Sequence, residues 1–355
     1  MKTKLVTICC CILIAFVVIG CGGGGKKDAA APAQVSQSAS GVPVLKEPVH
    51  LHIGSGSVGG ATYTAAVAIS QVVTEKVPNL RLTAELTASL GVNFAGTNNG
   101  DYEVGLTDIE FVYFGARGGN VSENPNYVNA PNIRALYAIE PTLSIAVVME
   151  SNSKIKSFED VLKPGIKIGG NLPGGGAYAM WGQLFELIDQ DWDKMVSFTG
   201  GHTQLAEALK DGIVDVVFNK CTGLSFPNGA FAELNTTSKV TYLAMPASVQ
   251  DKYIKKYPMY IKVDIPVGWG DTNTIKVPTP TVGANQTCIV NKDVPDDVVY
   301  LMVKAIMENL DELGLMNTSF KVLSKETAAK DLPCALHPGA ERYYKEKGYN
   351  ITYLQ

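Results

Sequence analysis

Short segments of alternating hydrophobic and polar residues recur along the chain, and helical patterns lie between them. The alternation predicts half-buried strands over residues 49–53 and 80–86. Between these strands Ala66, Ile69 and Val73 recur at helical spacing, and a Val-Pro-Asn sequence ends the helix. Because strand, helix and strand follow one another, we expect the two strands to pair in parallel.

The same alternation of strands and helices continues along the rest of the chain. Ser157, followed three residues later by Asp160, is typical of a helix N-cap and begins a second α/β unit. The order of the elements predicts a mixed α/β protein. The further predicted strands cover 104–106, 133–139, 145–149, 165–168, 214–218 and 281–290, and the further helices cover 176–188, 204–210 and 295–310.

Two glycine-rich turns, one in each α/β unit, separate a strand from a helix. They cover residues 53–60 and 168–176. The first backbone N–H groups of a helix lack intrahelical partners and carry partial positive charge, and glycine lets a carboxylate or phosphate approach them closely. Two such turns therefore predict a clamp around one small anion.

The first turn also fits the dinucleotide-binding fingerprint, with Gly54, Gly56 and Gly59 at the required spacing. Glu75 lies at about the distance along the chain that a ribose-binding acid would have. It ends the same predicted helix, however, whereas the fingerprint places this acid after the next strand. The sequence therefore does not favour a nicotinamide-dependent enzyme.

Other signatures of catalysis are missing. The chain contains no HExxH or GxSxG motif and no P-loop lysine, and no CxxC pair follows the first 20 residues. His50 and His52 face the same way on the first strand, but no third metal ligand lies nearby, so an exposed strand face is the simpler interpretation. We therefore expect a protein that is not an enzyme and that holds no metal or cofactor.

Residues 1–20 have the pattern of an export signal, because two lysines precede an apolar run that is too short to span a bilayer. The sequence Val-Ile-Gly-Cys at 18–21 looks like a bacterial lipobox. That resemblance makes Cys21 the lipid-attachment site, with ordinary cleavage as the alternative. Residues 21–47 have the Gly, Ala, Ser and Pro content of a flexible linker. We therefore expect a lipoprotein on the periplasmic side of the cell envelope, in contact with the membrane only through its lipid.

Composition narrows the picture further. The chain has 30 Lys and Arg against 34 Asp and Glu, a net charge of −4, which disfavours nucleic-acid binding. About 300 residues follow the linker, which is large enough for two lobes. Cys221, Cys288 and Cys334 allow at most one disulfide, and both a Cys288–Cys334 pairing and three buried thiols fit the sequence.

Several short motifs, taken together and in order, resemble those of the TAXI solute receptors of TRAP transporters. The match covers residues 49–348. The motifs are GSGSxGG at 54–60 with a tyrosine after it, EVGL at 103–106, IKSFED at 155–160, KIGG at 167–170, ALKDGIVD at 208–215, IPxG at 265–268 and HPGAxRYYK at 337–345.

This resemblance implies a two-lobed periplasmic-binding-protein fold, similar to type II, with a hinge of crossing strands. Lobe 1 comprises residues 48–140 and 283–355, and lobe 2 comprises residues 141–282. The implied function is a monomeric receptor that closes on a small organic acid or amino acid, such as a glutamate-like, glutamine-like or 2-oxo acid. The receptor delivers this solute to the membrane permease subunits of a TRAP transporter. A periplasmic ligand-binding sensor that is not coupled to transport is the alternative.

The resemblance also assigns ligand-binding positions to both glycine-rich turns and to the loop after the second strand. Tyr63 fits a wall position without ligand contact as well as it fits a ligand contact, and Asn93 fits a helix cap equally well. The carried-over positions are Ser55, Gly56, Gly59, Gly60, Tyr63, Ser89, Asn93, Gly174, Gly175, Gly176 and Ala177.

This sequence departs from the family pattern in ways that bear on the ligand. Ala61, Gly175 and Ala177 stand where hydroxyl residues are usual, so fewer side-chain donors reach a carboxylate. Asp108 stands where glutamine is usual, and it is interpreted either as the partner of a ligand ammonium group or as the cap of the next helix. Trp269, where tyrosine is common, is expected to widen the apolar wall of the site.

Overall fold

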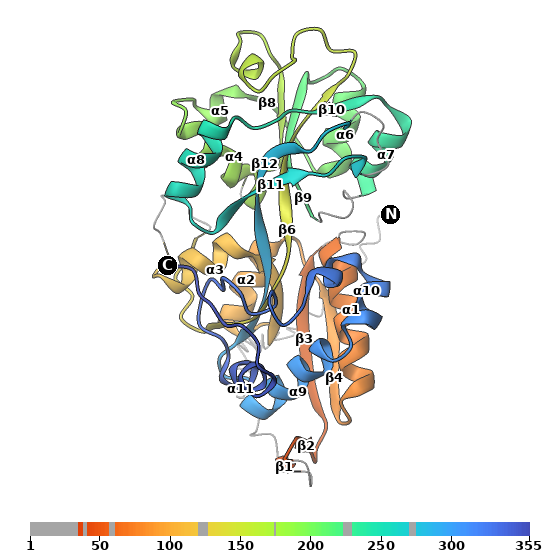
Figure 1. Cartoon of the computed structure of the whole chain (residues 1–355), viewed down its shortest axis with the longest axis vertical. Coiled ribbons are helices and arrows are strands. Elements are labelled where there is room, and N and C mark those ends of the chain that lie inside the picture. Colours follow the sequence, from red (N-terminus) through yellow and green to blue (C-terminus); the bar gives the residue numbers. More distant parts are fainter. Residues whose placement is uncertain are drawn as a thin grey trace, which may run out of the picture. The chain divides into compact units, whose positions relative to one another are not determined.

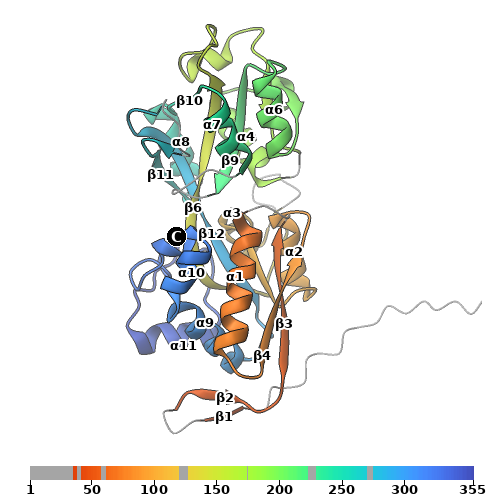
Figure 2. The same ribbon diagram turned by 90° about the vertical axis from the view of Figure 1, so that its right-hand side faces the viewer.

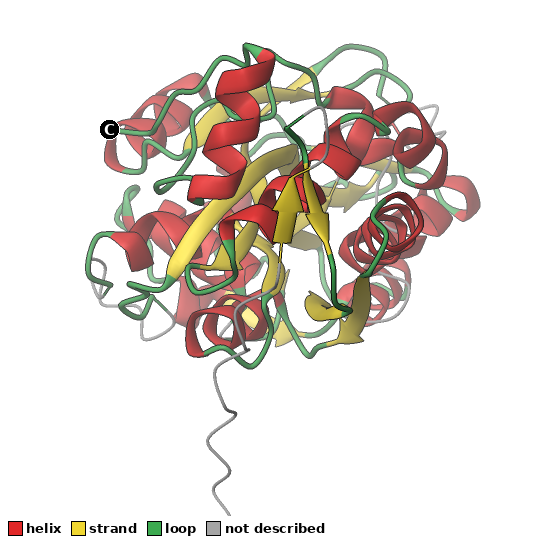
Figure 3. Cartoon of the chain, turned by 90° about the horizontal axis from the view of Figure 1, so that it is seen from below, coloured by secondary structure: helices red, strands yellow, loops and turns green. Residues whose placement is uncertain are grey.

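The computed structural model describes residues 35–37, 41–56, 61–119, 127–173, 175–222, 229–269 and 275–355. The chain after Pro32 forms one compact unit, in which helices surround a mixed sheet (Figure 1 and Figure 3). The strands are β1 (Val35–Gln37), β2 (Pro43–Leu45), β3 (Val49–Gly56), β4 (Leu80–Leu86), β5 (Val104–Asp108), β6 (Ile133–Met149), β7 (Ile168–Gly170), β8 (Val196–Thr199), β9 (Val216–Thr222), β10 (Val240–Tyr242), β11 (Tyr260–Ile265) and β12 (Thr279–Asn291). The helices are α1 (Ala61–Lys76), α2 (Leu90–Asn99), α3 (Ile109–Ala116), η1 (Glu159–Leu162), α4 (Gly176–Glu186), α5 (Trp192–Met195), α6 (His202–Lys210), α7 (Gly229–Thr237), α8 (Ala247–Lys256), α9 (Asp296–Met307), α10 (Leu310–Met316), η3 (Thr318–Val322) and α11 (Pro338–Lys347).

Among the described residues ten strands form one sheet, in the order β4-β3-β5-β12-β6-β9-β7-β8, with β10 paired to β6 and β11 to β12. β3 pairs in parallel with β4 and β5, as the strand-helix-strand order predicts. β7 likewise pairs in parallel with β8 and β9. β12 runs antiparallel to both β5 and β6. The sheet therefore has two parallel portions with antiparallel strands between them.

β6 is a single strand of 17 residues, where the alternation predicted two. Pro141 interrupts the pattern, because proline has no N–H to donate to the ladder. Next to it, the pairing of β6 with β12 shifts register between Asn285 and Thr287. β12 pairs with β5 over residues 286–290 and with β11 over 279–284. β6 and β12 thus connect the two parallel portions of the sheet, as Figure 2 also shows.

Hydrophobic side chains fill three core clusters. In the first, Ile69 of α1 and Val299 of α9 pack with strand residues such as Leu82. The third lies among β6, β9, α6 and α7. The second is rich in aromatic rings and contains Phe111 of α3 as well as Trp181 of α4. Because this second cluster draws on both portions of the sheet, the lobe boundaries at 140/141 and 282/283 stay predictions.

The segment after residue 155 differs from its prediction. Ser157 does not cap an α-helix, because a short 3-10 helix, η1, follows with Phe158 at its N-cap. The carboxylate of Asp160 instead accepts hydrogen bonds from the backbone N–H groups of Lys156 (2.7 Å) and Ser157 (3.0 Å). Asp160 therefore closes the turn itself, and the next strand begins only at Ile168.

The end of α3 is tied to the C-terminal part of the chain. Arg117 follows this helix, and its guanidinium donates to the carbonyl oxygens of Tyr113 (3.1 Å), Pro333 (2.9 Å) and Leu354 (2.9 Å). The guanidinium carbon lies 3.7 Å from the centre of the Tyr113 ring, within the range of a cation–π contact. These contacts fix α3, whose other end carries site residues described below.

The His-Pro-Gly motif at 337–339 begins α11. His337 is the N-cap, and its Nδ1 accepts a hydrogen bond from the N–H of Gly339 at 3.2 Å. A Cβ on Gly339 would lie 2.1 Å from the carbonyl oxygen of Asp296, so only glycine permits this approach of α11 to α9. Burial lowers the pKa of the His337 imidazole. The motif therefore serves helix packing.

The three cysteines after the linker form no disulfide in the structure. Cys221 and Cys288 are buried and Cys334 is partly buried. The pairing of Cys288 with Cys334 is therefore not formed, and the thiols pack as small apolar groups. Burial raises the pKa of Cys288 and of Cys334 to about 12, which makes both thiols poor nucleophiles.

Candidate functional site

The candidate site lies where several strands end. β3 ends at Gly56 and β5 at Asp108, and these two strands are parallel. Lys220 stands near the end of β9, and the loop after β7 leads into α4. In open α/β sheets the carboxyl ends of the strands are the usual place for a ligand. The end of β5, the end of β9 and the start of α4 are therefore the elements at which we look for a binding site.

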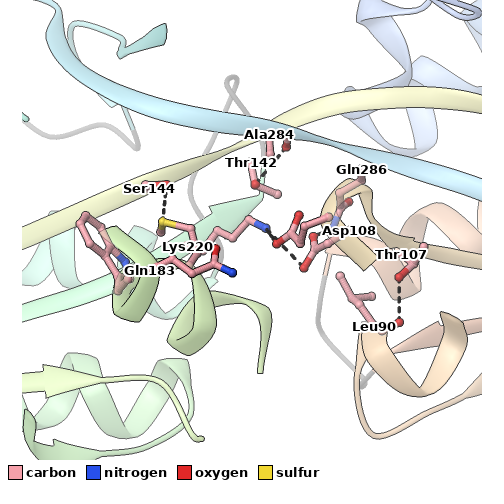
Figure 4. A network of polar contacts seen from close by, with 12 residues as sticks. Leu90, Thr107, Asp108, Thr142, Ser144, Gln183, Lys220, Ala284 and Gln286 are labelled. Atoms are coloured by element: carbon pink, nitrogen blue, oxygen red, sulfur yellow. Dashed lines mark hydrogen bonds and ion pairs between the residues drawn. The ribbon is translucent and has the colours of Figure 1, made fainter. Parts of the chain in front are cut away.

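A buried ion-pair network joins these elements. The ammonium group of Lys220 lies 2.7 Å from Oε1 of Glu110 and 3.4 Å from Oδ2 of Asp108. Figure 4 shows the lysine extending from β9 toward the first turn of α3. The side chains are 5% (Lys220), 0% (Glu110) and 9% (Asp108) exposed. The network therefore links α3 to β9 almost out of contact with solvent.

Burial and charge act against each other in this network. Burial raises the pKa of Glu110, although the nearby Lys220 ammonium opposes this shift. Burial alone would lower the pKa of Lys220, but the charges of Asp108 and Glu110 outweigh it and the pKa is raised. Lys220 is therefore the fixed positive charge of the site.

Asp108 has a different role from the capping role that the sequence allowed. It occupies the N-cap position of α3, but its side chain accepts no capping hydrogen bond. Its other oxygen, Oδ1, lies 3.5 Å from Nε2 of Gln286 on β12, the residue opposite it in the sheet. The carboxylate is thus held loosely by Lys220 and Gln286, and the cap interpretation of its side chain is wrong.

The N-terminus of α4 lies close to the same carboxylates. Gly175 is its N-cap and has no side chain to accept from the first N–H groups of the helix. A Cβ on Gly176 would lie 2.8 Å from Oδ2 of Asp108 and 3.4 Å from Oε1 of Glu110. The second glycine-rich turn therefore lets a helix N-terminus approach the network closely, as expected for an anion-binding turn.

Several polar atoms near Glu110 have no hydrogen-bond partner among the described residues. They are Oε2 of Glu110, the hydroxyls of Tyr127 and Tyr260, and Nε2 of Gln183. Burial, followed by the Glu110 charge, raises the pKa of both tyrosines well above the usual value. Tyr253 donates to Oε1 of Gln183 at 3.3 Å. Because buried polar groups are normally paired, this unpaired set is a signal of a binding region.

Three residues carried over from the TAXI resemblance have protein partners in the structure. Ser55 donates to the carbonyl oxygen of Glu85 at 2.7 Å. Ser89 caps α2 by accepting from the N–H of Val92. Asn93 is fully buried. Its Oδ1 accepts a hydrogen bond from the Thr87 hydroxyl (2.5 Å), and its Nδ2 donates one to the carbonyl oxygen of Leu106 (2.7 Å). Their side chains thus have structural roles, and any contact with a ligand stays a prediction.

The remaining positions that the sequence analysis named fall into four groups. Gly56 has φ of 112°, a conformation suited to glycine, and Tyr63 is a half-buried residue of α1. Trp269 is buried in the third core cluster, with its ring 5.5 Å from that of Tyr242. Gly175, Gly176 and Ala177 form the start of α4 beside the network. Gly59, Gly60, Gly174 and the proposed lipid-attachment residue Cys21 lie outside the described residues.

Sequence reasoning missed Glu110 and Lys220. Each is the only charged residue of an otherwise uncharged element, Glu110 in the hydrophobic α3 and Lys220 in β9. A charge inside an element that must be buried needs a partner, and that signal was available in the sequence. The sequence did not show which residue is the partner, because the two residues are 110 positions apart.

The other features of the described residues are less suited to be the binding site. A surface pocket of about 400 Å³ lies between α10 and η3, lined by residues such as Leu315 and Phe320, and contains none of the site residues. In the described part of the chain no group of three or more His, Cys, Asp or Glu could hold a metal ion. No helix in that part is long and apolar enough to cross a membrane.

Comparison with solved structures defines the class of fold. The periplasmic binding protein BugD aligns with a TM-score of 0.51 at 14% identity, over 86% of this chain and 99% of its own. MatC from Rhodopseudomonas palustris, with bound malate, aligns with a TM-score of 0.51 at 16% identity, over 77% of this chain and 89% of its own. The protein thus has the α/β fold of the periplasmic binding proteins, as predicted. The profile of the NMT1-like family matches residues 53–348, and the chain belongs to that family.

Proposed function

We propose that the protein is the extracytoplasmic solute-binding receptor of a TRAP transporter, closing on a small organic acid or amino acid and delivering it to the membrane permease. The periplasmic-binding-protein fold and the ordered motifs that resemble TAXI receptors support this function. Malate in MatC is an example of a small organic acid held by a protein of this fold.

The buried network of Asp108, Glu110 and Lys220 at the start of α4 is the observation that carries the proposal. It combines anion-binding groups, namely the Lys220 ammonium and the helix N-terminus, with two carboxylates that bind cations. An α-amino acid carries both kinds of group on one carbon. In this proposal the solute carboxylate binds α4 and Lys220, and its ammonium group binds Asp108 and Glu110.

The same network supports the proposed division into two lobes, residues 48–140 with 283–355 and residues 141–282. Asp108 and Glu110 belong to the first lobe, and Lys220 and α4 belong to the second. β6 and β12 run between the lobes as the crossing strands, and their register shift near Pro141 is a suitable place for bending. A solute held by both lobes would stabilise the closed form by its higher affinity for that form.

A thermal-shift panel tests the proposed function on the chain that begins at Gly22. The protein is unfolded in urea, dialysed and refolded to remove any retained solute. It is then exposed to acidic and neutral amino acids, 2-oxo acids, dicarboxylates and aliphatic acids. At a hundredfold excess over Kd a ligand adds about 2.7 kcal/mol, which raises Tm by several degrees. Refolded protein that responds to no compound of the panel contradicts the proposal.

A further inference from the structure

The charges of the buried network do not balance. Asp108 and Glu110 bring two carboxylates, whereas Lys220 brings one ammonium group. The lysine is close to Glu110 at 2.7 Å and more distant from Asp108 at 3.4 Å. Oε2 of Glu110 is buried and has no hydrogen-bond partner among the described residues. With both carboxylates ionised the network therefore carries one uncompensated negative charge, which a further cationic group would neutralise.

The groups beside the two carboxylates also include ones that favour an anion. The first turn of α4 supplies backbone N–H groups without intrahelical partners, and the missing side chain of Gly176 lets this turn lie against Asp108 and Glu110. The Lys220 ammonium adds a full positive charge on the same side as the carboxylates it contacts. The unpaired oxygen of Glu110 thus favours a cation, whereas Lys220 and the start of α4 favour an anion.

We propose that Lys220 and Glu110 set the charge of the solute that the site accepts, as two opposed specificity-determining residues. This inference rests on the proposed receptor function and deepens it. Lys220 cancels one of the two carboxylates and the site keeps one net negative charge, so a solute that carries an ammonium group beside its carboxylate is favoured over the same acid without the ammonium group. Glu110 rejects solutes that carry the carboxylate without the ammonium group, because its unpaired oxygen would face an anion.

The two residues therefore have opposite effects when their charges are removed. Glu110→Gln leaves one carboxylate, already matched by Lys220, so the preference for a solute ammonium group weakens and anionic solutes gain affinity relative to amino acids. Lys220→Gln leaves two unmatched carboxylates, and the site then prefers a cation. The double variant keeps only the Asp108 carboxylate and so has the same single net negative charge as the wild type, and its charge preference should return toward that of the wild type.

Calorimetric titration with matched solutes measures this preference. The probes are L-alanine, L-leucine and L-glutamine, each with its 2-oxo acid and its decarboxylated amine, so that only the charged groups change within a series. For Glu110→Gln we expect the affinity ratio of 2-oxo acid to amino acid to rise about tenfold to a hundredfold, the effect of one hydrogen bond to a charged group. For Lys220→Gln we expect a rise of similar size in the ratio of amine to amino acid.

Lys262→Gln and Glu341→Gln serve as matched controls. Both residues form exposed ion pairs, Lys262 with Asp251 and Glu341 with Lys345, and should leave every ratio unchanged. Circular dichroism and melting confirm that each variant folds; if Lys220→Gln does not, the nearly isosteric Glu110→Gln supplies the test. A solute that binds both the wild type and Glu110→Gln with the same charge preference overturns the inference alone. Failure of the wild type to bind any solute overturns the receptor function and the inference with it.

Discussion

Gly176 lies directly against Asp108, since a Cβ on the glycine would stand 2.8 Å from Oδ2 of the carboxylate. Gly176→Ala forces the start of α4 away from the network. We expect the free energy of unfolding to fall by about 1–3 kcal/mol, as for other overpacked positions, and solute affinity to fall with it. Urea unfolding and calorimetric titration measure the two effects.

Gly182, one turn and a half further along α4, is the matched control. A Cβ there would lie 3.5 Å from Cδ1 of Trp192, an ordinary contact. Gly182→Ala should therefore stabilise the protein by up to about 1 kcal/mol through helix propensity and leave solute affinity unchanged. Equal behaviour of the two variants would contradict the close approach at Gly176.

Asn93 is expected to act on stability and not on binding. Its amide holds the Thr87 hydroxyl and the carbonyl oxygen of Leu106, both at buried positions. Asn93→Ala leaves these groups unpaired, and we expect a loss of roughly 1–3 kcal/mol in the free energy of unfolding. Loss of solute affinity at unchanged stability would instead support the ligand contact that the TAXI resemblance implies.

Replacement of Lys220 by an uncharged residue should destabilise the solute-free protein. Lys220→Met leaves Asp108 and Glu110 without their cation, and breaking a buried pair in this way costs about 3–5 kcal/mol. Adding Glu110→Gln removes one of the unmatched charges, so the double variant should recover part of this loss. Urea unfolding measures both variants, and a double variant no more stable than Lys220→Met would show that the pair does not act through charge.

The buried imidazole of His337 should make the free energy of unfolding depend on pH. Burial lowers the pKa of the folded imidazole, although Asp296 at 3.8 Å opposes the shift. The unfolded chain therefore binds more protons below about pH 6.5, and stability falls as the pH drops through the lowered pKa, by at most about 1.4 kcal/mol per pH unit.

His337→Asn keeps a capping acceptor and removes the titrating group. Urea unfolding at a series of pH values should therefore show a shallower acid loss for this variant than for the wild type. His202, whose pKa burial also lowers, is present in both proteins and does not affect the difference. Parallel stability curves would assign the acid loss to other groups.

Cys21 is expected to determine where the protein is found in the cell. If the lipobox resemblance holds, the wild type incorporates labelled palmitate and stays with the membrane fraction after a salt wash, because more than one acyl chain holds it. Cys21→Ser should lose the label and move to the soluble periplasmic fraction. Unchanged partitioning of this variant would refute lipid anchoring.

Hydrophobic periodicity predicted the elements whose partners lie nearby in the chain. The pairing of β3 with β4 follows from the pattern of residues 49–86, since the connecting helix α1 brings the strands together in parallel. The TAXI resemblance predicted the class of fold, which the comparisons bear out. Periodicity could not show that β6 is one strand, because Pro141 breaks the alternation although Ala138 and Thr142, on either side of it, both pair with β12.

The candidate site was predicted only in part. The glycine-rich turn before α4 and Asp108 were identified, because glycine content and charge are visible in the sequence itself. Lys220 and Glu110 meet across 110 residues, and their contact depends on how β9 and α3 are placed by the sheet. A contact of this kind belongs to tertiary structure, which a local pattern does not contain.

The three hydrogen bonds of Arg117 determine which positions can be substituted in evolution. All three acceptors are backbone carbonyl oxygens, those of Tyr113, Pro333 and Leu354. Every amino acid carries such an oxygen, so replacements at 333 and 354 leave these bonds intact, whereas only a planar group with several donors can replace the arginine. Among homologues, selection on these contacts should therefore preserve position 117 while positions 333 and 354 vary freely.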